Sequence, residues 1–173
     1  MFALRSALLA LWLAALACKG PNTPATRGVE SRADATTPVT LRDSLTFSLE
    51  TPARATRGTP VPFVLRLVNV SSRRLTLYLR GREISFDLRV TGLGGALQWQ
   101  RLAGRSIPAI IQVRELKPRE VIRLTDVWDQ RTATGDPVQP GEYQVQGLLL
   151  TDGEPLRTAP VQFRVDAGGK REQ

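Results

Sequence analysis

The residue best placed for covalent chemistry is Cys18, the only cysteine in the sequence. It follows an apolar run from Ala7 to Ala17, which is preceded by the positive charge of Arg5. The run is too short to cross a hydrocarbon core of about 30 Å as a helix, but it fits the hydrophobic region of a signal peptide. Formation of a thioether to lipid requires a sulfur nucleophile. We therefore expect cleavage before Cys18 and lipidation of its thiol.

The residues before the cysteine strengthen this expectation, because Ala15-Leu16-Ala17-Cys18 resembles the lipobox of bacterial lipoproteins. The lipobox usually has leucine three places before the cysteine, whereas Leu16 lies two places before it. The resemblance implies a lipid-anchored protein of the bacterial cell envelope, and Lys19 after the cysteine favours the outer membrane in a Gram-negative organism. The alternative is an ordinary secretory signal with an incidental cysteine.

Enzymatic chemistry is poorly supported by the sequence. Histidine is absent, which removes the commonest general base and metal ligand. Serines 71 and 72 have no GxSxG context, and there is no phosphate-binding glycine loop or cluster of metal-ligand residues. Four carboxylates that could in principle pair for acid/base work lie singly on predicted strand edges; they are Glu83, Asp87, Asp126 and Asp129. We predict no enzymatic activity, no cofactor and no metal.

The net charge is +8, and 21 of the 24 basic residues are arginine. A basic protein can attract nucleic acid or anionic surfaces. These charges are spread along the predicted strands instead of forming a cluster. We therefore interpret them as a solvated surface and expect no nucleic-acid partner.

The 173 residues divide by composition into four parts. Residues 1–17 form the predicted signal peptide, and residues 18–43 the lipidated cysteine with a disordered tether rich in Pro, Thr and Ala. A flexible chain of that length reaches about 25–30 Å. Residues 44–165 are enough for one folded domain with a single core, which we expect to be monomeric, and residues 166–173 form a disordered tail.

The folded region is predicted from alternating apolar and polar residues. Leu45–Leu49, Leu75–Leu79 and Ile84–Val90 alternate with period two, as half-buried antiparallel strands do. A more continuous apolar strand is expected at 62–68, and further strands at 96–100, 109–114, 121–128, 143–150 and 161–165. Turn residues separate these segments. The fold class is therefore all-β, an immunoglobulin-like antiparallel β-sandwich of about 7–9 strands.

Some residues have expected roles in that sandwich. Gly141 and Tyr143 fit a tyrosine corner, in which the phenol bonds to an earlier backbone group. Trp99 and Trp128 are expected in the core, and the alternative is an exposed stacking platform for a glycan. Asn69-Val70-Ser71 matches a glycosylation sequon, but we interpret it as a turn.

The order of these segments resembles the BsuPI-type intracellular proteinase inhibitor family from about Phe63 to Val165. The resemblance is carried by Phe63–Ser71, Ile84–Val90, Leu97–Gln100, Trp128–Gln130 and Gly135–Gly147. After Trp99 the family tends to have a second tryptophan and then Phe-Gln, which are missing here. The resemblance implies the sandwich fold and a protein partner, possible partners including a serine protease. The protein that gives the family its name is intracellular, whereas this chain has a predicted export signal.

If the domain inhibits a protease, a rigid scaffold would present a loop to the protease cleft. The best sequence candidate lies between two predicted strands and offers two basic side chains that suit a trypsin-like pocket; it comprises Arg101, Leu102, Ala103, Gly104, Arg105, Ser106, Ile107 and Pro108. A second candidate is Thr132–Val138. The alternative function is a non-inhibitory adaptor of the cell envelope that binds through a sheet edge or face.

Overall fold

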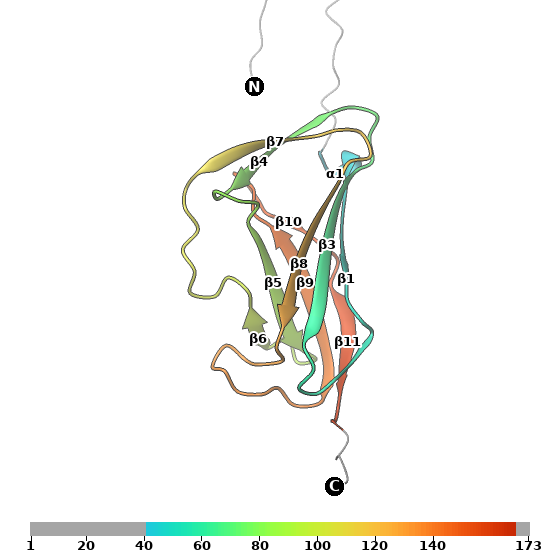
Figure 1. Ribbon diagram of the computed structural model, residues 1–173, viewed down its shortest axis with the longest axis vertical. Helices are drawn as coiled ribbons and strands as arrows, with labels where there is room; N and C mark the ends of the chain where they lie inside the picture. The colour runs from blue at the N-terminus through green and yellow to red at the C-terminus, as the bar shows by residue number, and fades with distance from the viewer. Residues whose placement is uncertain (1–40, 169–173) are drawn as a thin grey trace, which may run out of the picture. The chain divides into compact units, whose positions relative to one another are not determined.

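The computed structural model describes residues 41–168. Within them a four-residue helix, α1 (Leu41–Ser44), is followed by eleven strands (Figure 1). The strands are β1 (Leu45–Glu50), β2 (Arg54–Thr56), β3 (Val61–Asn69), β4 (Leu75–Arg80), β5 (Phe86–Gly92), β6 (Leu97–Gln100), β7 (Ile111–Leu116), β8 (Val121–Trp128), β9 (Gly141–Leu149), β10 (Leu156–Arg157) and β11 (Val161–Asp166). In residues 41–168 no helix is long and apolar enough to cross a membrane.

The strands form two main sheets and a separate ribbon. One sheet has the order β1-β3-β8, and the other has the order β2-β11-β9-β5-β6 with β10 paired to β9. The ribbon consists of β4 and β7 alone. Figure 1 shows the ribbon at one end of the sandwich, beside α1.

The first part of the domain contributes to both sheets. β1 pairs antiparallel with β3, and β2 then pairs in parallel with the last strand, β11. With β3 and β8 in one sheet and β5, β9 and β11 in the other, this is an immunoglobulin-like sandwich. The predicted fold class is confirmed; nine strands have four or more residues, and the short strands β2 and β10 were not expected.

The core lies between the two sheets and is centred on aromatic side chains. Trp128 is fully buried, and its ring centroid lies 5.8 Å from that of Tyr143 and 6.4 Å from that of Trp99. Phe63 and Phe163 complete the cluster. Trp99 is half-buried and packs against this core. Since neither indole forms an exposed platform, the glycan-stacking alternative loses its support.

The predicted tyrosine corner is present at the start of β9. Gly141 is the first residue of the strand, and the Tyr143 hydroxyl donates a hydrogen bond to the Gln139 carbonyl oxygen at 2.5 Å. Burial raises the pKa of Tyr143 above its ordinary value, and the positive charge of Arg57 partly opposes that rise. The corner closes the long connection between β8 and β9.

Asn69 has a structural role that fits the turn interpretation of its sequon. Its side chain is fully buried, and its amide nitrogen donates to the carbonyl oxygens of Arg73, Leu116 and Lys117 at 2.7–3.1 Å. Its Oδ1 accepts a hydrogen bond from the Ser71 backbone N–H at 2.9 Å. Asn69 therefore joins the β3–β4 turn to the β7–β8 turn.

Candidate functional site

The sequence-predicted inhibitory segment lies in the loop that connects β6 to β7, residues 101–110. Figure 1 shows this loop running along one flank of the sandwich, from β6 to the ribbon. Ala103, Gly104, Arg105 and Ser106 are exposed, as are Pro108 and the residues that follow it as far as the start of β7. Gly104 has a φ of 69°, a left-handed conformation that glycine adopts without strain.

The first end of this loop is held by the carboxylate of Asp87, which lies on β5. Asp87 is 3% exposed, and its Oδ1 accepts hydrogen bonds from the backbone N–H groups of Leu88 and Leu102, both at 3.0 Å. Its Oδ2 accepts from the Gln100 side chain and lies 3.7 Å from Nε of Arg89. A charge-assisted bond to the Leu102 N–H fixes where the loop leaves the sheet.

Arg101 holds the same end of the loop from the other side. Its guanidinium is bonded to the Asp126 carboxylate, donates to the Phe86 carbonyl oxygen at 2.9 Å, and lies 3.9 Å from the centroid of the Phe86 ring. Its side chain is 23% exposed. Of the two predicted basic anchors, Arg101 is therefore engaged with the body of the domain, and Arg105 is the one presented to solvent.

The second end of the loop is held through its backbone. The Gly81 N–H donates to the Ile110 carbonyl oxygen at 2.8 Å, and the Gln112 side chain donates to the Gly81 carbonyl oxygen at 3.3 Å. A side chain at position 81 would collide with Ser85, because a Cβ there would lie 2.2 Å from its Oγ, and the φ of 96° favours glycine as well. The loop is thus fixed at both ends and exposed between them.

The second candidate loop, Thr132–Val138, is closed by its own hydrogen bonds and is bonded to β6, where the Gln98 carbonyl oxygen accepts from the Ala133 N–H at 2.8 Å. The Thr132 N–H donates to the Asp136 carbonyl oxygen at 2.8 Å, and the Thr134 hydroxyl donates to the Asp136 carboxylate at 2.7 Å. Arg131 donates to the Gly135 carbonyl oxygen at 2.7 Å. Its polar side chains are largely used within the loop.

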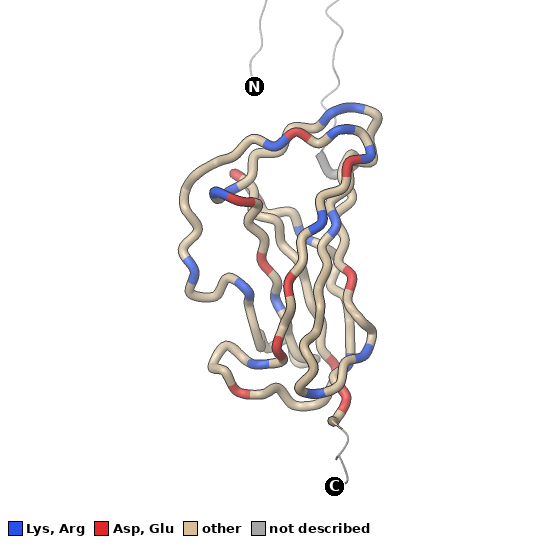
Figure 2. Tube along the Cα trace, viewed as in Figure 1, with Lys and Arg blue, Asp and Glu red and all other residues tan. Residues whose placement is uncertain are grey.

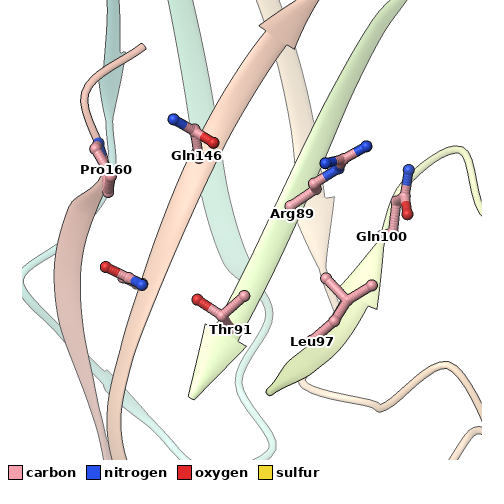
Figure 3. A pocket seen from close by; sticks show the side chains of 7 residues that line it. Arg89, Thr91, Leu97, Gln100, Gln146 and Pro160 are labelled. Carbon is pink, nitrogen blue, oxygen red and sulfur yellow. The ribbon is translucent and has the colours of Figure 1, made fainter. Parts of the chain in front are cut away.

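A polar hollow lies on the outer face of the larger sheet and extends to the edge strand β6. It has a volume of about 460 Å³. Its lining residues come from β5, β6 and β9 and from the residue before β11; they are Arg89, Thr91, Leu97, Gln100, Gln144, Gln146 and Pro160 (Figure 3). Gln146 donates to the Thr158 carbonyl oxygen at 3.0 Å, which orients its amide. This surface offers amide groups and one guanidinium to a polar partner.

Several of the charged residues form ion pairs. Figure 2 shows Lys and Arg interspersed with Asp and Glu along the strands and turns. Asp87 lies beside Arg89 and Asp126 beside Arg101, as described above. A carboxylate oxygen of Asp129 lies 3.8 Å from Nε of Arg131. Among residues 41–168 no group of three or more metal-ligating side chains is present. The predicted signal flank Ala15–Ala17 and Cys18 lie outside the described residues.

Solved structures with distant similarity belong to proteins of several kinds. A β-glucosidase from Erythrobacter marinus is 15% identical with a TM-score of 0.40, over 71% of this chain and 15% of that chain. The alkylpurine DNA glycosylase AlkC of Pseudomonas fluorescens is 15% identical with a TM-score of 0.42, over 72% and 31%. A CARDB domain from Pyrococcus furiosus is 16% identical with a TM-score of 0.37, over 71% and 86%. This chain thus spans only a small part of the two enzymes.

No curated protein matches the sequence. A family model does: the intracellular proteinase inhibitor family BsuPI matches residues 48–154. The matched region runs from β1 to the turn after β9 and includes the β6–β7 loop. Since it covers more than half of the chain, the protein belongs to the BsuPI family of intracellular proteinase inhibitors.

Proposed function

We propose that the protein inhibits a serine protease by placing residues 103–108 of the β6–β7 loop in the active-site cleft. The observation that supports this proposal most directly is the loop's construction: both ends are bonded to other parts of the domain, and the residues between them are exposed apart from the half-buried Ile107. A loop fixed in one conformation loses little entropy on binding. It also resists productive cleavage, because its ends cannot separate freely after a cut.

Within this loop we assign the contact with the protease's specificity pocket to Arg105. Its side chain is exposed, whereas Arg101 is bonded to Asp126 and Phe86. A guanidinium suits a pocket with an acidic residue at its base, as in trypsin-like enzymes. The proposed partner is therefore a protease that recognises basic residues.

We propose further that the inhibitor works outside the cytoplasm, anchored by lipid on Cys18, in the outer membrane if the organism is Gram-negative. This part rests on the apolar run and the Ala15-Leu16-Ala17-Cys18 string alone. It differs from the intracellular setting in the family's description. Mass spectrometry of the protein from its native membrane fraction tests it, because lipidation adds diacylglyceryl mass to a chain that starts at Cys18.

The inhibition is tested with the chain from residue 19 onward, assayed against trypsin-like and subtilisin-like proteases. We expect competitive inhibition of a trypsin-like enzyme, with the β6–β7 loop intact by mass spectrometry. Arg105→Ala should weaken inhibition at least tenfold without changing Tm, because an exposed side chain contributes little to stability. Equal inhibition by this variant contradicts the assignment of Arg105, and inhibition of no protease contradicts the proposed function.

The alternative is a non-inhibitory adaptor, and the polar hollow on the larger sheet is the observation that favours it. An adaptor would bind its partner through this face, so Gln144→Ala and Gln146→Ala would weaken binding while Arg105→Ala would not. Pull-down of an envelope protein by the wild type and its loss in the glutamine variants would support the adaptor.

A further inference from the structure

The ribbon of β4 and β7 carries an exposed apolar surface next to the candidate inhibitory loop. Of the nine large hydrophobic side chains exposed among the described residues, four lie on or beside this ribbon. They are Tyr78 at 49% exposure, Ile110 at 42%, Ile111 at 43% and Val113 at 63%. We call Tyr78, Ile111 and Val113 the apolar ribbon face, and Ile110 directly precedes it in the chain.

The strand register shows that three of these side chains share one side of the ribbon. Tyr78 lies opposite Val113, and Arg80 lies opposite Ile111, so their side chains point to the same side. The neighbouring residues on β4, Leu77 and Leu79, are buried against the core. The ribbon thus has a buried apolar side and an exposed side. On the exposed side Tyr78, Ile111 and Val113 lie among Thr76, Arg80 and Glu115, although a solvated side is usually polar in an antiparallel sheet.

The ribbon is held firmly to the rest of the domain. Outside its own ladder, the Arg80 N–H donates to the Leu150 carbonyl oxygen at 3.1 Å, and the Asp152 N–H donates to the Tyr78 carbonyl oxygen at 3.0 Å. The apolar ribbon face is therefore a fixed surface. Contiguous exposed apolar surface on a soluble domain commonly marks a site of protein contact.

We propose that the apolar ribbon face is a second contact surface for the protease whose cleft receives the β6–β7 loop. This inference rests on the proposed inhibitory function. It follows from continuity, since Ile110 and Ile111 directly continue the loop into β7. The size of a stable interface supports it as well. Such an interface buries about 800 Å² on each partner and involves about 20–30 residues a side, more than residues 103–108 alone provide. The partner surface is an apolar patch on the rim of the protease's active-site cleft.

The test compares aspartate substitutions at two exposed valines. Val113→Asp places a charge on the apolar ribbon face, and Val127→Asp places one on the outer side of β8, in the other sheet, where Val127 is 54% exposed. Inhibition constants are measured against the protease that the wild type inhibits. We expect Val113→Asp to raise the constant at least tenfold and Val127→Asp to change it less than twofold, with both variants keeping the wild-type Tm. If Val113→Asp lowers Tm, Tyr78→Ala replaces it.

Each outcome separates this inference from the function on which it rests. An inhibitory wild type with an equally inhibitory Val113→Asp variant overturns the second contact surface and leaves the loop proposal intact. A wild type that inhibits no protease overturns both. A dimer in light scattering that dissociates in the Val113→Asp variant assigns the surface to a second copy of the chain, which also overturns the inference.

Discussion

The loops after β6 and β8 are both long connections between strands, but they are fixed in different ways. The loop at 129–140 is closed by bonds among its own residues, including Thr134 to Asp136 and Arg131 to Gly135. The loop at 101–110 is held by residues of other strands, chiefly Asp87 on β5 and Asp126 on β8. The loop at 129–140 is also attached to other parts of the domain, because the Gln130 side chain donates to the carbonyl oxygens of Thr56 and Thr59 and the Ala133 N–H donates to that of Gln98. The two loops therefore differ mainly in how many of their own polar side chains bond within the loop.

This difference decides what each loop can offer to a partner. Polar side chains that bond within a loop are occupied, so loop 129–140 presents few free groups. Loop 101–110 is fixed at its ends, so its middle keeps exposed side chains in a defined position without using them for its own support. Preorganised loops of this kind bind with a smaller entropy cost. The comparison therefore favours loop 101–110 as the functional one.

The largest effect is expected from Asp87→Ala, which removes the acceptor at the base of loop 101–110. The N–H of Leu102 and the amide of Gln100 would lose their partner at a partly buried position. We expect a loss of about 2–3 kcal/mol in the free energy of unfolding and strongly weakened inhibition, measured by urea unfolding and protease assay.

Asp136→Ala is the matched control in the loop at 129–140. Asp136 is exposed. The side chain that donates a hydrogen bond to its carboxylate is that of Thr134. We expect a loss of less than about 1 kcal/mol and unchanged inhibition. If both variants weaken inhibition equally, the two loops do not differ in function as the comparison requires.

A smaller effect is expected from Arg101→Ala, which removes the bond to Asp126 and the contact with the Phe86 ring. We expect a loss of about 1–2 kcal/mol and faster cleavage of the loop in limited proteolysis. A double-mutant cycle with Asp126→Ala should give a coupling energy of about 1 kcal/mol. Additive effects of the two substitutions would show that the pair does not hold the loop.

A further small effect is expected from Tyr143→Phe, on β9 at the end of the loop at 129–140. The variant loses the hydrogen bond to Gln139 and about 1 kcal/mol at neutral pH. Burial raises the pKa of Tyr143, so its stabilising effect is full below the ordinary value of 10.0 and is lost as pH rises through the folded-state pKa. The wild type and the variant should therefore converge in stability above pH 10, as measured by urea unfolding at several pH values. A gap that widens there contradicts this assignment.

Features that follow from local patterns were predictable from the sequence. The alternation in residues 121–128 predicted β8 with the bounds that the structure shows, and Gly141-Glu142-Tyr143 predicted the corner at the start of β9. In both cases the determining residues lie within a few positions of each other. Such signals can be recognised without knowing which strands pair with each other.

Features that depend on distant partners were not predictable. β2 is only three residues long and exists because it pairs with β11, more than 100 positions later in the chain. The sequence likewise suggested two equivalent basic anchors, but Arg101 meets Asp126 and Phe86 only in the folded domain. The exposure of Val113 also depended on which side of the ribbon faces the core. None of these three features produces a periodic pattern in the sequence.

The division of the first part of the domain between two sheets also bears on how the domain responds to force. A pull on the chain before residue 41, directed along β1, would load six residue pairs with β3 together, from Leu45 with Asn69 to Glu50 with Val64. Figure 1 shows α1 and the end of β11 at opposite ends of the sandwich. Tension between the two termini would therefore shear the ladders at β1 and β2 instead of peeling them open one bond at a time.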